Sequence, residues 1–423
     1  MNLKEIARYA KIKGLQLVGT GDFTHPQWLK EIQETLIPES DSGLFRLKED
    51  SSPEPVRFML TAEVCTIYNY EGKSRKVHHV ILEPNLDCVA QTNEKLGRLG
   101  DLSSDGRPIF GITSPQLVEE IMQVSAENVV FPAHAWTPWF SVFGAFSGFD
   151  TIEDCYQDMT KHIHALETGL SSDPAMNWRL SSLDRFTLVS NSDSHSFWPW
   201  RIGREANVFD LEHATYQEII EAIQTKDTKR FKFTIETDPA YGKYHWTGHR
   251  NCNVSLSPQE ARKLSNFCPV CGRTLTEGVE QRVEELADRP RDHKMANSPG
   301  FMRLMPLHEI IAAVIDAASP STQAVWKIYT PLVSKFGDEY AVLIDAPKEA
   351  LGAATDPRIA DAILKVREGS VTVIPGYDGV YGKLLLSQVE KETMPRDKAQ
   401  ENSEQRLKPP RGRVQQSSIG DFI

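Results

Sequence analysis

The chain has 423 residues, which is too long for one ordinary domain and predicts two or three. Its composition, 40% hydrophobic and 25% charged, is that of a globular protein, and the absence of any run of eighteen apolar residues predicts no membrane span. The first residues lack the apolar core of a signal peptide, so we expect a cytoplasmic protein. The net charge of -11 argues mildly against a nucleic-acid partner, although carboxylates gathered around metal ions would lower the total without removing a local basic groove.

Residues 1–235 are expected to alternate between helices and strands. Asn2 can cap a first helix that Gly14 ends. Helical patterns such as Pro115–Val124 separate several of the strands. The alternation predicts parallel βα units, in an open sheet or a barrel, and therefore an α/β fold. The expected strands are Leu15–Gly19, Phe58–Val64, Val77–Leu82, Asn128–Ala133, Ala165–Gly169 and Thr187–Asn191.

Beyond residue 235 the sequence divides into three further regions. Residues 236–290 carry Cys and His on short loops and predict a small zinc-binding module. Residues 286–300 have the composition of a linker, and residues 291–385 predict a C-terminal helical domain. Residues 386–423 form a polar tail with a basic run, which is typical of disorder.

Carboxylates and imidazoles stand at the C-terminal ends of the expected strands, where α/β barrels assemble their active sites. Mixed ligands of this kind suit zinc, manganese or iron, and several together suit a multinuclear site. A single His after a strand is more often an ordinary hydrogen-bonded residue, but six strand ends in register are hard to explain in that way, so we predict a metal site. The candidate residues are Asp22, His25, Glu63, His78, His79, His134, Glu167, Asp193 and His195.

A second group of ligands has the spacing of a zinc site. His249-x2-Cys252 is followed after fifteen residues by Cys268-x2-Cys271, and Gly272 fits the tight turn that would bring two thiolates to one ion. The alternative, unrelated buried thiols, would not produce this spacing. A closed four-ligand site has no open position, so we expect it to be structural or to present DNA-contacting side chains.

Three longer strings resemble the endonuclease Q family of the PHP (polymerase and histidinol phosphatase) superfamily. They are Val-Gly-Thr-Gly-Asp-Phe-Thr-His-Pro from residue 18, Arg-Ile-Gly-Arg-Glu from residue 201 and Gly-Lys-Tyr-His from residue 242, and the resemblance covers residues 1 to about 385. It implies a distorted (βα)7 barrel, a zinc-binding domain, often with four cysteines, and a helical domain. PHP proteins open with a His-x-His strand that this chain lacks. We expect the true start to lie upstream of Met1; the alternative is a form that is incompletely metallated.

The resemblance also implies a function and a site. The function is a metal-dependent DNA endonuclease that hydrolyses the phosphodiester 5′ of hypoxanthine, uracil, xanthine or an abasic site. Asp193 and Glu167 are the implied catalytic residues, and Zn²⁺ is the implied metal, with Mg²⁺ or Mn²⁺ as alternatives. His25 is a weaker match, and His78 should face away from His79 because strand side chains alternate. The implied barrel ligands are Asp22, Glu63, His79, His134, Asp193 and His195.

Two further features could meet DNA. Residues 131–149 contain seven aromatic side chains. They form either a pocket or wedge that stacks on an extruded base, with Trp136, Trp139 and Phe140 in contact with it, or a small aromatic core beneath a long loop. Candidate phosphate contacts are Arg201, Arg204 and Lys243, although single basic residues usually form solvated surface.

The chain ends in a pattern that resembles sliding-clamp peptides, namely Gln416, Ile419, Phe422 and Ile423. It predicts a partner of the PCNA type or its bacterial equivalent, and with it a nucleoid-associated protein. Two other functions stay open. A PHP phosphoesterase of small phosphate esters would need neither the zinc module nor this peptide. A catalytically impaired, clamp-associated DNA-binding protein would fit the missing His-x-His.

Overall fold

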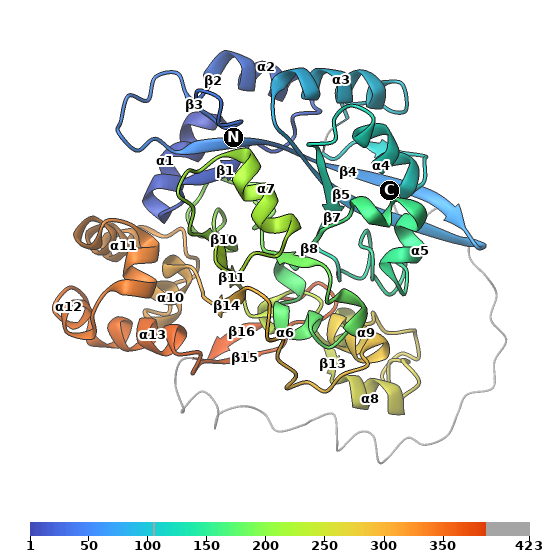
Figure 1. Cartoon of the computed structure of the whole chain (residues 1–423). Helices are drawn as coiled ribbons and strands as arrows, with labels where there is room; N and C mark the ends of the chain where they lie inside the picture. Colours follow the sequence, from blue (N-terminus) through green and yellow to red (C-terminus); the bar gives the residue numbers. More distant parts are fainter. Residues whose placement is uncertain (105, 386–423) are drawn as a thin grey trace.

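A seven-stranded sheet dominates the N-terminal half of the computed structural model, which describes residues 1–104 and 106–385 (Figure 1). Its strands follow the order β2-β3-β4-β5-β7, and β1 and β6 both join β4. The strands are β1 (Leu17–Gly19), β2 (Leu36–Pro38), β3 (Phe45–Leu47), β4 (Arg57–Tyr70), β5 (Lys73–Glu83), β6 (Ile109–Phe110) and β7 (Val129–Pro132). The helices of this half are α1 (Leu3–Lys13), α2 (Pro26–Thr35), α3 (Leu86–Gly97), α4 (Ser114–Met122) and α5 (Ile152–Tyr156).

The expected strands of residues 1–235 are all present, but the expected parallel arrangement is only partly right. β1 lies parallel to β4, and β8 (Ala165–Glu167) lies parallel to β9 (Thr187–Val189). β4 and β5 instead form a long antiparallel hairpin, and β7 is antiparallel to β5. The hairpin turns at Glu71 and Gly72, whose φ angles of 50° and 75° suit the two-residue turn that matches strand twist. The fold is mixed α/β, and the closed (βα)7 barrel stays a prediction.

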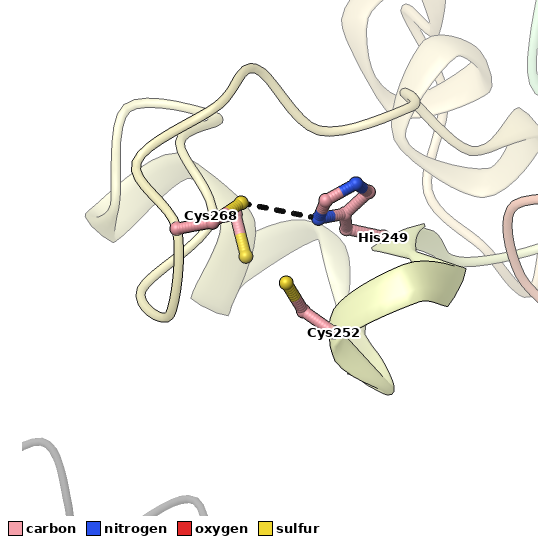
Figure 2. A group of neighbouring side chains, drawn as sticks. His249, Cys252 and Cys268 are labelled. Carbon is pink, nitrogen blue, oxygen red and sulfur yellow. Dashed lines mark hydrogen bonds between the residues drawn. The ribbon is translucent and has the colours of Figure 1, made fainter.

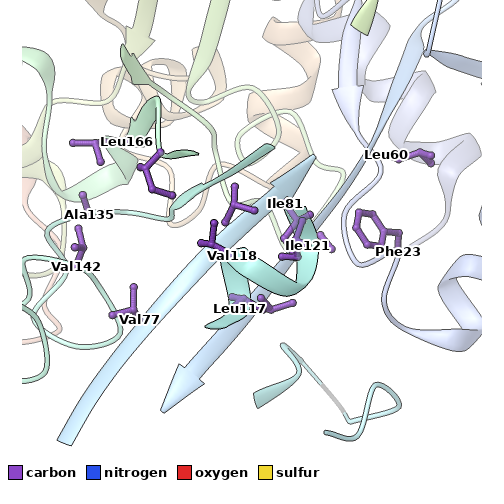
Figure 3. Close-up of a cluster of buried hydrophobic side chains, with 14 of the residues drawn as sticks. Phe23, Leu60, Val77, Ile81, Leu117, Val118, Ile121, Ala135, Val142 and Leu166 are labelled. Atoms are coloured by element: carbon purple, nitrogen blue, oxygen red, sulfur yellow. The ribbon is translucent and has the colours of Figure 1, made fainter. Parts of the chain in front are cut away.

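The first helix confirms its sequence signals. The Asn2 side chain accepts the Glu5 backbone N–H at 2.8 Å, and Gly14 ends the helix with a φ of 97°. Its apolar face, with Leu3 and Ile6, joins a core that also contains the side chains of Figure 3. That core contains side chains from β4, β5 and β7 and from α1, α3 and α4. Packing between these elements therefore fixes the positions of the strands that carry the candidate ligands.

Apart from α6, which lies between β8 and β9, the remaining elements follow the β8–β9 pair. A three-stranded sheet has the order β10-β11-β14, and two shorter pairs are β12–β13 and β15–β16. These strands are β10 (Ala206–Phe209), β11 (Phe231–Glu236), β12 (Thr247–His249), β13 (Val254–Leu256), β14 (Gly300–Arg303), β15 (Thr372–Ile374) and β16 (Lys383–Leu385). The helices are α6 (Pro174–Asn177), α7 (Tyr216–Gln224), α8 (Pro258–Lys263), α9 (Val279–Leu286), α10 (Leu307–Val314), α11 (Gln323–Phe336), α12 (Lys348–Gly352) and α13 (Pro357–Arg367).

The segment 286–300, expected to be a linker, is fixed to the rest of the molecule. Arg289 forms two hydrogen bonds with Asp184, at 2.7 and 2.6 Å, and Asp288 accepts the backbone N–H of Ser181 at 2.9 Å. Directly after it, β14 pairs in parallel with β11. The segment between α9 and β14 is a loop, as the composition predicts, and the hydrogen bonds of Asp288 and Arg289 hold it against the residues around Ser181 and Asp184.

A buried ion pair connects α1 to the C-terminal helices. Lys13 Nζ lies 2.7 Å from Glu339 Oε1, and the two side chains are 1% and 0% exposed. Glu339 also accepts the backbone N–H of Leu307 at 2.9 Å and the Tyr329 hydroxyl at 2.8 Å. Since both charges are desolvated, each depends on the other for compensation.

Two predictions concern the rest of the chain. Within the residues that the structure describes, no helix combines the length and apolar character that a membrane crossing needs. The clamp-like peptide, Gln416, Ile419, Phe422 and Ile423, lies outside the described residues.

Candidate functional site

The hairpin register decides which side chains face the candidate site. Glu63 on β4 lies opposite Val80 on β5, and directly opposed residues of an antiparallel pair share a face. His78 lies two residues from Val80 and therefore points to the same side as Glu63. The result is a short contact, since His78 Nδ1 lies 2.9 Å from Glu63 Oε1.

His79 faces the other way and is not part of this site. It lies opposite Val64 and is fully buried. Its Nδ1 lies 2.8 Å from the Tyr156 hydroxyl and its Nε2 lies 2.9 Å from Thr66 Oγ1, so both ring nitrogens have partners. Burial lowers the pKa of His79 to about 3. The prediction of His79 as a metal ligand is wrong. The alternation between the two histidines is confirmed, but it is His78 that faces Glu63.

His134 completes a three-residue cluster. Its Nε2 lies 3.0 Å from His78 Nδ1 and 3.3 Å from Glu63 Oε1. Burial alone would raise the pKa of Glu63, but hydrogen bonds to His134 and His78 outweigh it and hold the pKa well below its usual range. Gly169 (φ 62°) lets the turn after β8 approach this closely, since a Cβ there would lie 2.8 Å from the His134 Cβ.

Glu167, at the end of β8, forms a hydrogen bond with the backbone of the turn at His134. One carboxyl oxygen accepts the His134 backbone N–H at 2.7 Å, and the other accepts the Asn191 side-chain amide at 2.9 Å. The side chain is 3% exposed, and burial raises its pKa to about 7. Glu167 therefore fixes the backbone of a clustered residue.

Asp193 joins the cluster through an arginine. Arg107 Nε lies 2.6 Å from Glu63 Oε1, and its terminal nitrogen lies 2.8 and 2.9 Å from the two Asp193 oxygens. His195, 76% exposed, has its Nε2 3.4 Å from Asp193 Oδ1. Arg107 was not predicted from the sequence, because it lies in a loop before β6 and belongs to no ligand motif.

The two candidates of the first motif lie differently. Asp22 is exposed, but the protein around it excludes part of the water from its carboxylate, and this desolvation raises the pKa of the group. The positive charge of Arg107 opposes the rise, and the negative charge of Glu63 adds to it. Asp22 is thus within electrostatic reach of the cluster. His25 lies at the N-cap of α2 and is not among the clustered donors that the structure describes.

Backbone conformation supports a functional reading of three of these positions. Asp22, His134 and Asp193 have φ angles of 45°, 30° and 40°, which are uncommon for residues with a Cβ. Such strain concentrates at functional sites, where the surrounding structure enforces it.

The geometry and the donor chemistry fit a metal ion. One donor atom each from Glu63, His78 and His134 lies within 4.8 Å of the others. A carboxylate with two imidazoles suits zinc, manganese or iron. Asp193 and Asp22 add carboxylates nearby, and the metal role of each residue stays a prediction.

The predicted zinc module brings its four ligands together. Donor atoms of His249, Cys252, Cys268 and Cys271 lie within 4.8 Å of one another, and Figure 2 shows His249, Cys252 and Cys268 turned toward a common centre. The Gly272 N–H donates to the Cys268 carbonyl at 2.8 Å, which closes the expected turn. These contacts are compatible with a metal ion in a closed tetrahedral site.

Cys268→Ser is expected to remove about one metal ion per chain, because a three-ligand remnant binds zinc weakly. The variant should also lower the melting temperature of the full-length protein. Elemental analysis of the purified protein measures the loss. Cys88→Ser is the matched control, since Cys88 is a buried thiol away from the cluster. Identical metal content in wild type and Cys268→Ser would contradict the assignment.

The aromatic segment 131–149 contains both buried and exposed aromatic side chains. Trp136 is 1% exposed, donates to Asn177 at 2.8 Å and packs on Phe143. It belongs to the core, so its prediction as a base contact is wrong. Trp139 and Phe146 are 38% and 46% exposed and stack on each other at 4.9 Å. Phe140, half-buried, lies 5.0 Å from the His78 ring, which brings the segment to the candidate site.

Of the three candidate phosphate contacts, one is buried and two are exposed. Arg204 is 4% exposed and forms an ion pair with Glu309 at 2.6 Å, so the prediction that it contacts phosphate is wrong. A buried pair of this kind holds structure instead. Arg201 is exposed, and Lys243 is exposed with its Nζ 4.7 Å from the Tyr381 ring, so both stay available.

Comparisons with known proteins give the following matches. Residues 306–370 match the family model of the MJ0043 C-terminal domain. The uncharacterized protein MJ0043 of Methanocaldococcus jannaschii is 33% identical over 256 residues, which are 59% of this chain and 31% of that protein. The chain therefore spans less than a third of that relative. The uncharacterized protein YqxK of Bacillus subtilis is 28% identical over 383 residues, 88% of this chain and 89% of that protein.

Two solved structures are similar over nearly their whole length. One is the lesion-specific endonuclease PfuEndoQ from Pyrococcus furiosus, 33% identical with a TM-score of 0.80, covering 96% of this chain and 95% of that one. The other is an endonuclease Q in complex with a 27-mer duplex substrate with an abasic lesion at the active site. It is 34% identical with a TM-score of 0.80 and covers 92% of each chain.

Proposed function

We propose that this chain, which belongs to the endonuclease Q family, is a DNA-repair endonuclease that cuts the backbone beside a damaged nucleotide. The observation that carries the proposal is the convergence of Glu63, His78 and His134, with Glu167 and Asp193 around them, in a chain that covers 95% of a lesion-specific endonuclease. Phosphodiester hydrolysis needs a water held beside a phosphate whose charge is offset, and clustered metal ligands serve that purpose.

The proposed chemistry assigns a part to each group. Glu63, His78 and His134 would hold a divalent metal, with Asp22 and Asp193 as further carboxylates. When bound, the metal supplies an activated water and offsets phosphate charge. Glu167 keeps His134 oriented through the backbone hydrogen bond described above. His195 lies at the solvent-exposed rim of the site, beside Asp193.

The proposed substrate is duplex DNA with hypoxanthine, uracil, xanthine or an abasic site, cut on the 5′ side of the lesion. The similar endonuclease Q structure holds a duplex with an abasic lesion, which supports DNA as the partner. The exposed Trp139–Phe146 stack offers aromatic faces for a base, and Arg201 and Lys243 offer charges for phosphates. Aromatic stacking is sequence-tolerant, which suits an enzyme that acts at several lesions.

We also propose that residues 1–235 form a PHP-type catalytic barrel, that 236–290 form the zinc module and that 291–385 form the C-terminal helical domain. The four-ligand cluster lies within the second of these regions and the match at residues 306–370 within the third, which supports treating them as separate units.

A substrate panel tests the function. The wild-type chain should nick a labelled duplex with a single deoxyinosine, deoxyuridine or abasic site, and should leave the undamaged duplex intact. A chelator should stop the reaction and a divalent metal should restore it. Hydrolysis of a small phosphate ester with no nicking would favour a phosphoesterase instead. DNA binding without hydrolysis of either substrate would favour a non-catalytic binding protein.

A further inference from the structure

A surface pocket outside the metal cluster has no role in the chemistry above. It has a volume of about 230 Å³, and its lining includes Ala175 and Met176 from α6 and Pro239 from the turn after β11. Its charged and polar lining consists of Arg179, Arg291, Arg303, His245, Asp238 and Glu280. The helices α6 and α9, which border it, lie side by side in the lower centre of Figure 1.

The two carboxylates of the pocket already have partners. Glu280 lies 2.8 Å from Arg291 and accepts the Trp246 indole N–H at 2.8 Å. Asp238 accepts the backbone N–H of Ala240 at 2.9 Å and lies 4.0 Å from Arg303. These groups therefore have little capacity left for the remaining cations of the pocket.

Arg179 is the cation without a partner. Its guanidinium forms no ion pair and donates no hydrogen bond among the described residues, and its Nε is buried. The buried Nδ1 of His245 also has no partner in that part of the chain. Burial and the neighbouring charge of Arg291 lower the pKa of Arg179, although Glu284 and Glu280, the carboxylates that pair with Arg291, oppose this. A bound anion would give the Arg179 guanidinium the direct partner that it lacks.

The lining distinguishes between two kinds of ligand. A nucleobase pocket usually stacks the base between aromatic or apolar faces. Apart from His245, no aromatic side chain lines this pocket, and six of its nine lining residues are charged or polar. A guanidinium matches a phosphate group in both charge and bidentate geometry. The chemistry therefore favours a phosphate over a base.

The pocket is lined by residues at strand ends that neighbour the end of β8. Glu167 ends β8, and Asp238 and Arg303 lie at or just beyond the carboxyl ends of β11 and β14. The hydroxyl of Thr168, the residue after Glu167, donates to Glu236 at 3.0 Å, so the ends of β8 and β11 are adjacent. A strand bound at the metal cluster can therefore extend toward the pocket.

We propose that this pocket binds a backbone phosphate of the DNA, with Arg179 as its main contact. The proposal rests on the proposed function, since it takes DNA as the ligand. It adds a site that fixes the position of the strand without reading its sequence, as phosphate contacts do.

Arg179→Gln tests the proposal, measured as the affinity of the full-length chain for a lesion-bearing duplex and for the matched undamaged duplex. The variant should weaken binding to both duplexes by the same factor, roughly fivefold or more at physiological salt. The slope of log affinity against log salt should fall by about one, the value for one lost phosphate contact. Arg179→Lys keeps the charge and should keep the wild-type slope.

Arg98→Gln is the matched control, because Arg98 is an exposed arginine at the C-terminal end of α3, and Figure 1 shows α3 at the top of the view and α6 in its lower centre. It should change neither affinity nor slope. Weakening confined to the lesion-bearing duplex would assign Arg179 to the base and overturn the phosphate site. Unchanged binding of a folded Arg179→Gln to both duplexes would overturn it as well. A wild type that binds no DNA would refute the proposed function itself, which is a separate result.

Discussion

His78→Gln is expected to reduce nicking of a lesion-bearing duplex by at least about a hundredfold, because it removes an imidazole from the proposed metal site. Loss of a residue that only supports a metal ligand typically costs ten- to a hundredfold, and a direct ligand should cost more. The contact of His78 Nδ1 with Glu63, at 2.9 Å, places it among the clustered donors. Single-turnover nicking and the metal content of the purified variant measure the effect.

His79→Gln is the matched comparison, since it makes the same chemical change one residue away. His79 is fully buried and bonded to Tyr156 and Thr66, so its loss should lower stability and leave the single-turnover rate of the folded protein near that of wild type. A reversed pattern, with His79→Gln inactive and metal-free and His78→Gln active, would show that the structural assignment of the pair is wrong.

Lys13→Met is expected to lower the free energy of unfolding by about 3–5 kcal/mol, the usual cost of leaving one member of a buried ion pair without its partner. Glu339 would keep its bonds from Leu307 and Tyr329 but would lose the only nearby cation that bonds it directly among the described residues. Urea unfolding of the full-length chain, followed by tryptophan fluorescence, measures the change.

Two further variants test whether the unpaired buried charge causes this loss of stability. Lys4→Met removes an exposed ion pair with Glu49, whose side chains are 58% and 74% exposed, and should cost less than about 1 kcal/mol. Lys13→Met with Glu339→Gln removes both charges and should recover much of the stability that Lys13→Met loses. Glu339→Gln alone gives the second single effect. If the double variant loses as much stability as Lys13→Met and Glu339→Gln lose together, lost packing and not an unpaired charge explains the effect.

The sequence predicted the positions of the strands and most of the residues that lie around the candidate site, but not which face each side chain takes. Two adjacent histidines on a strand always point in opposite directions, and the pattern alone does not say which one faces the site. The register that decides it is set by the turn at Glu71 and Gly72, and a shift of one residue would exchange the two faces. His78 therefore required the pairing of β4 with β5.

The cluster of His249, Cys252, Cys268 and Cys271 was more predictable because its members are close in the sequence. Two pairs at fixed spacing on tight turns bring their donors together whatever the rest of the fold does. Trp136, Arg204 and Arg107 show the opposite case. Their contacts lie far away in the sequence, at Asn177, Glu309 and Asp193, so residue type alone could not separate core from surface.

The position of the nick tests the account most directly. A lesion should be placed at three positions along otherwise identical duplexes, and the products of the wild-type chain should be sized at single-nucleotide resolution. The account predicts one cut per duplex, on the 5′ side of the lesion, that moves with it at a constant offset and requires a divalent metal. Cuts at fixed positions, or equal cutting of the undamaged duplex, would contradict a lesion-specific endonuclease.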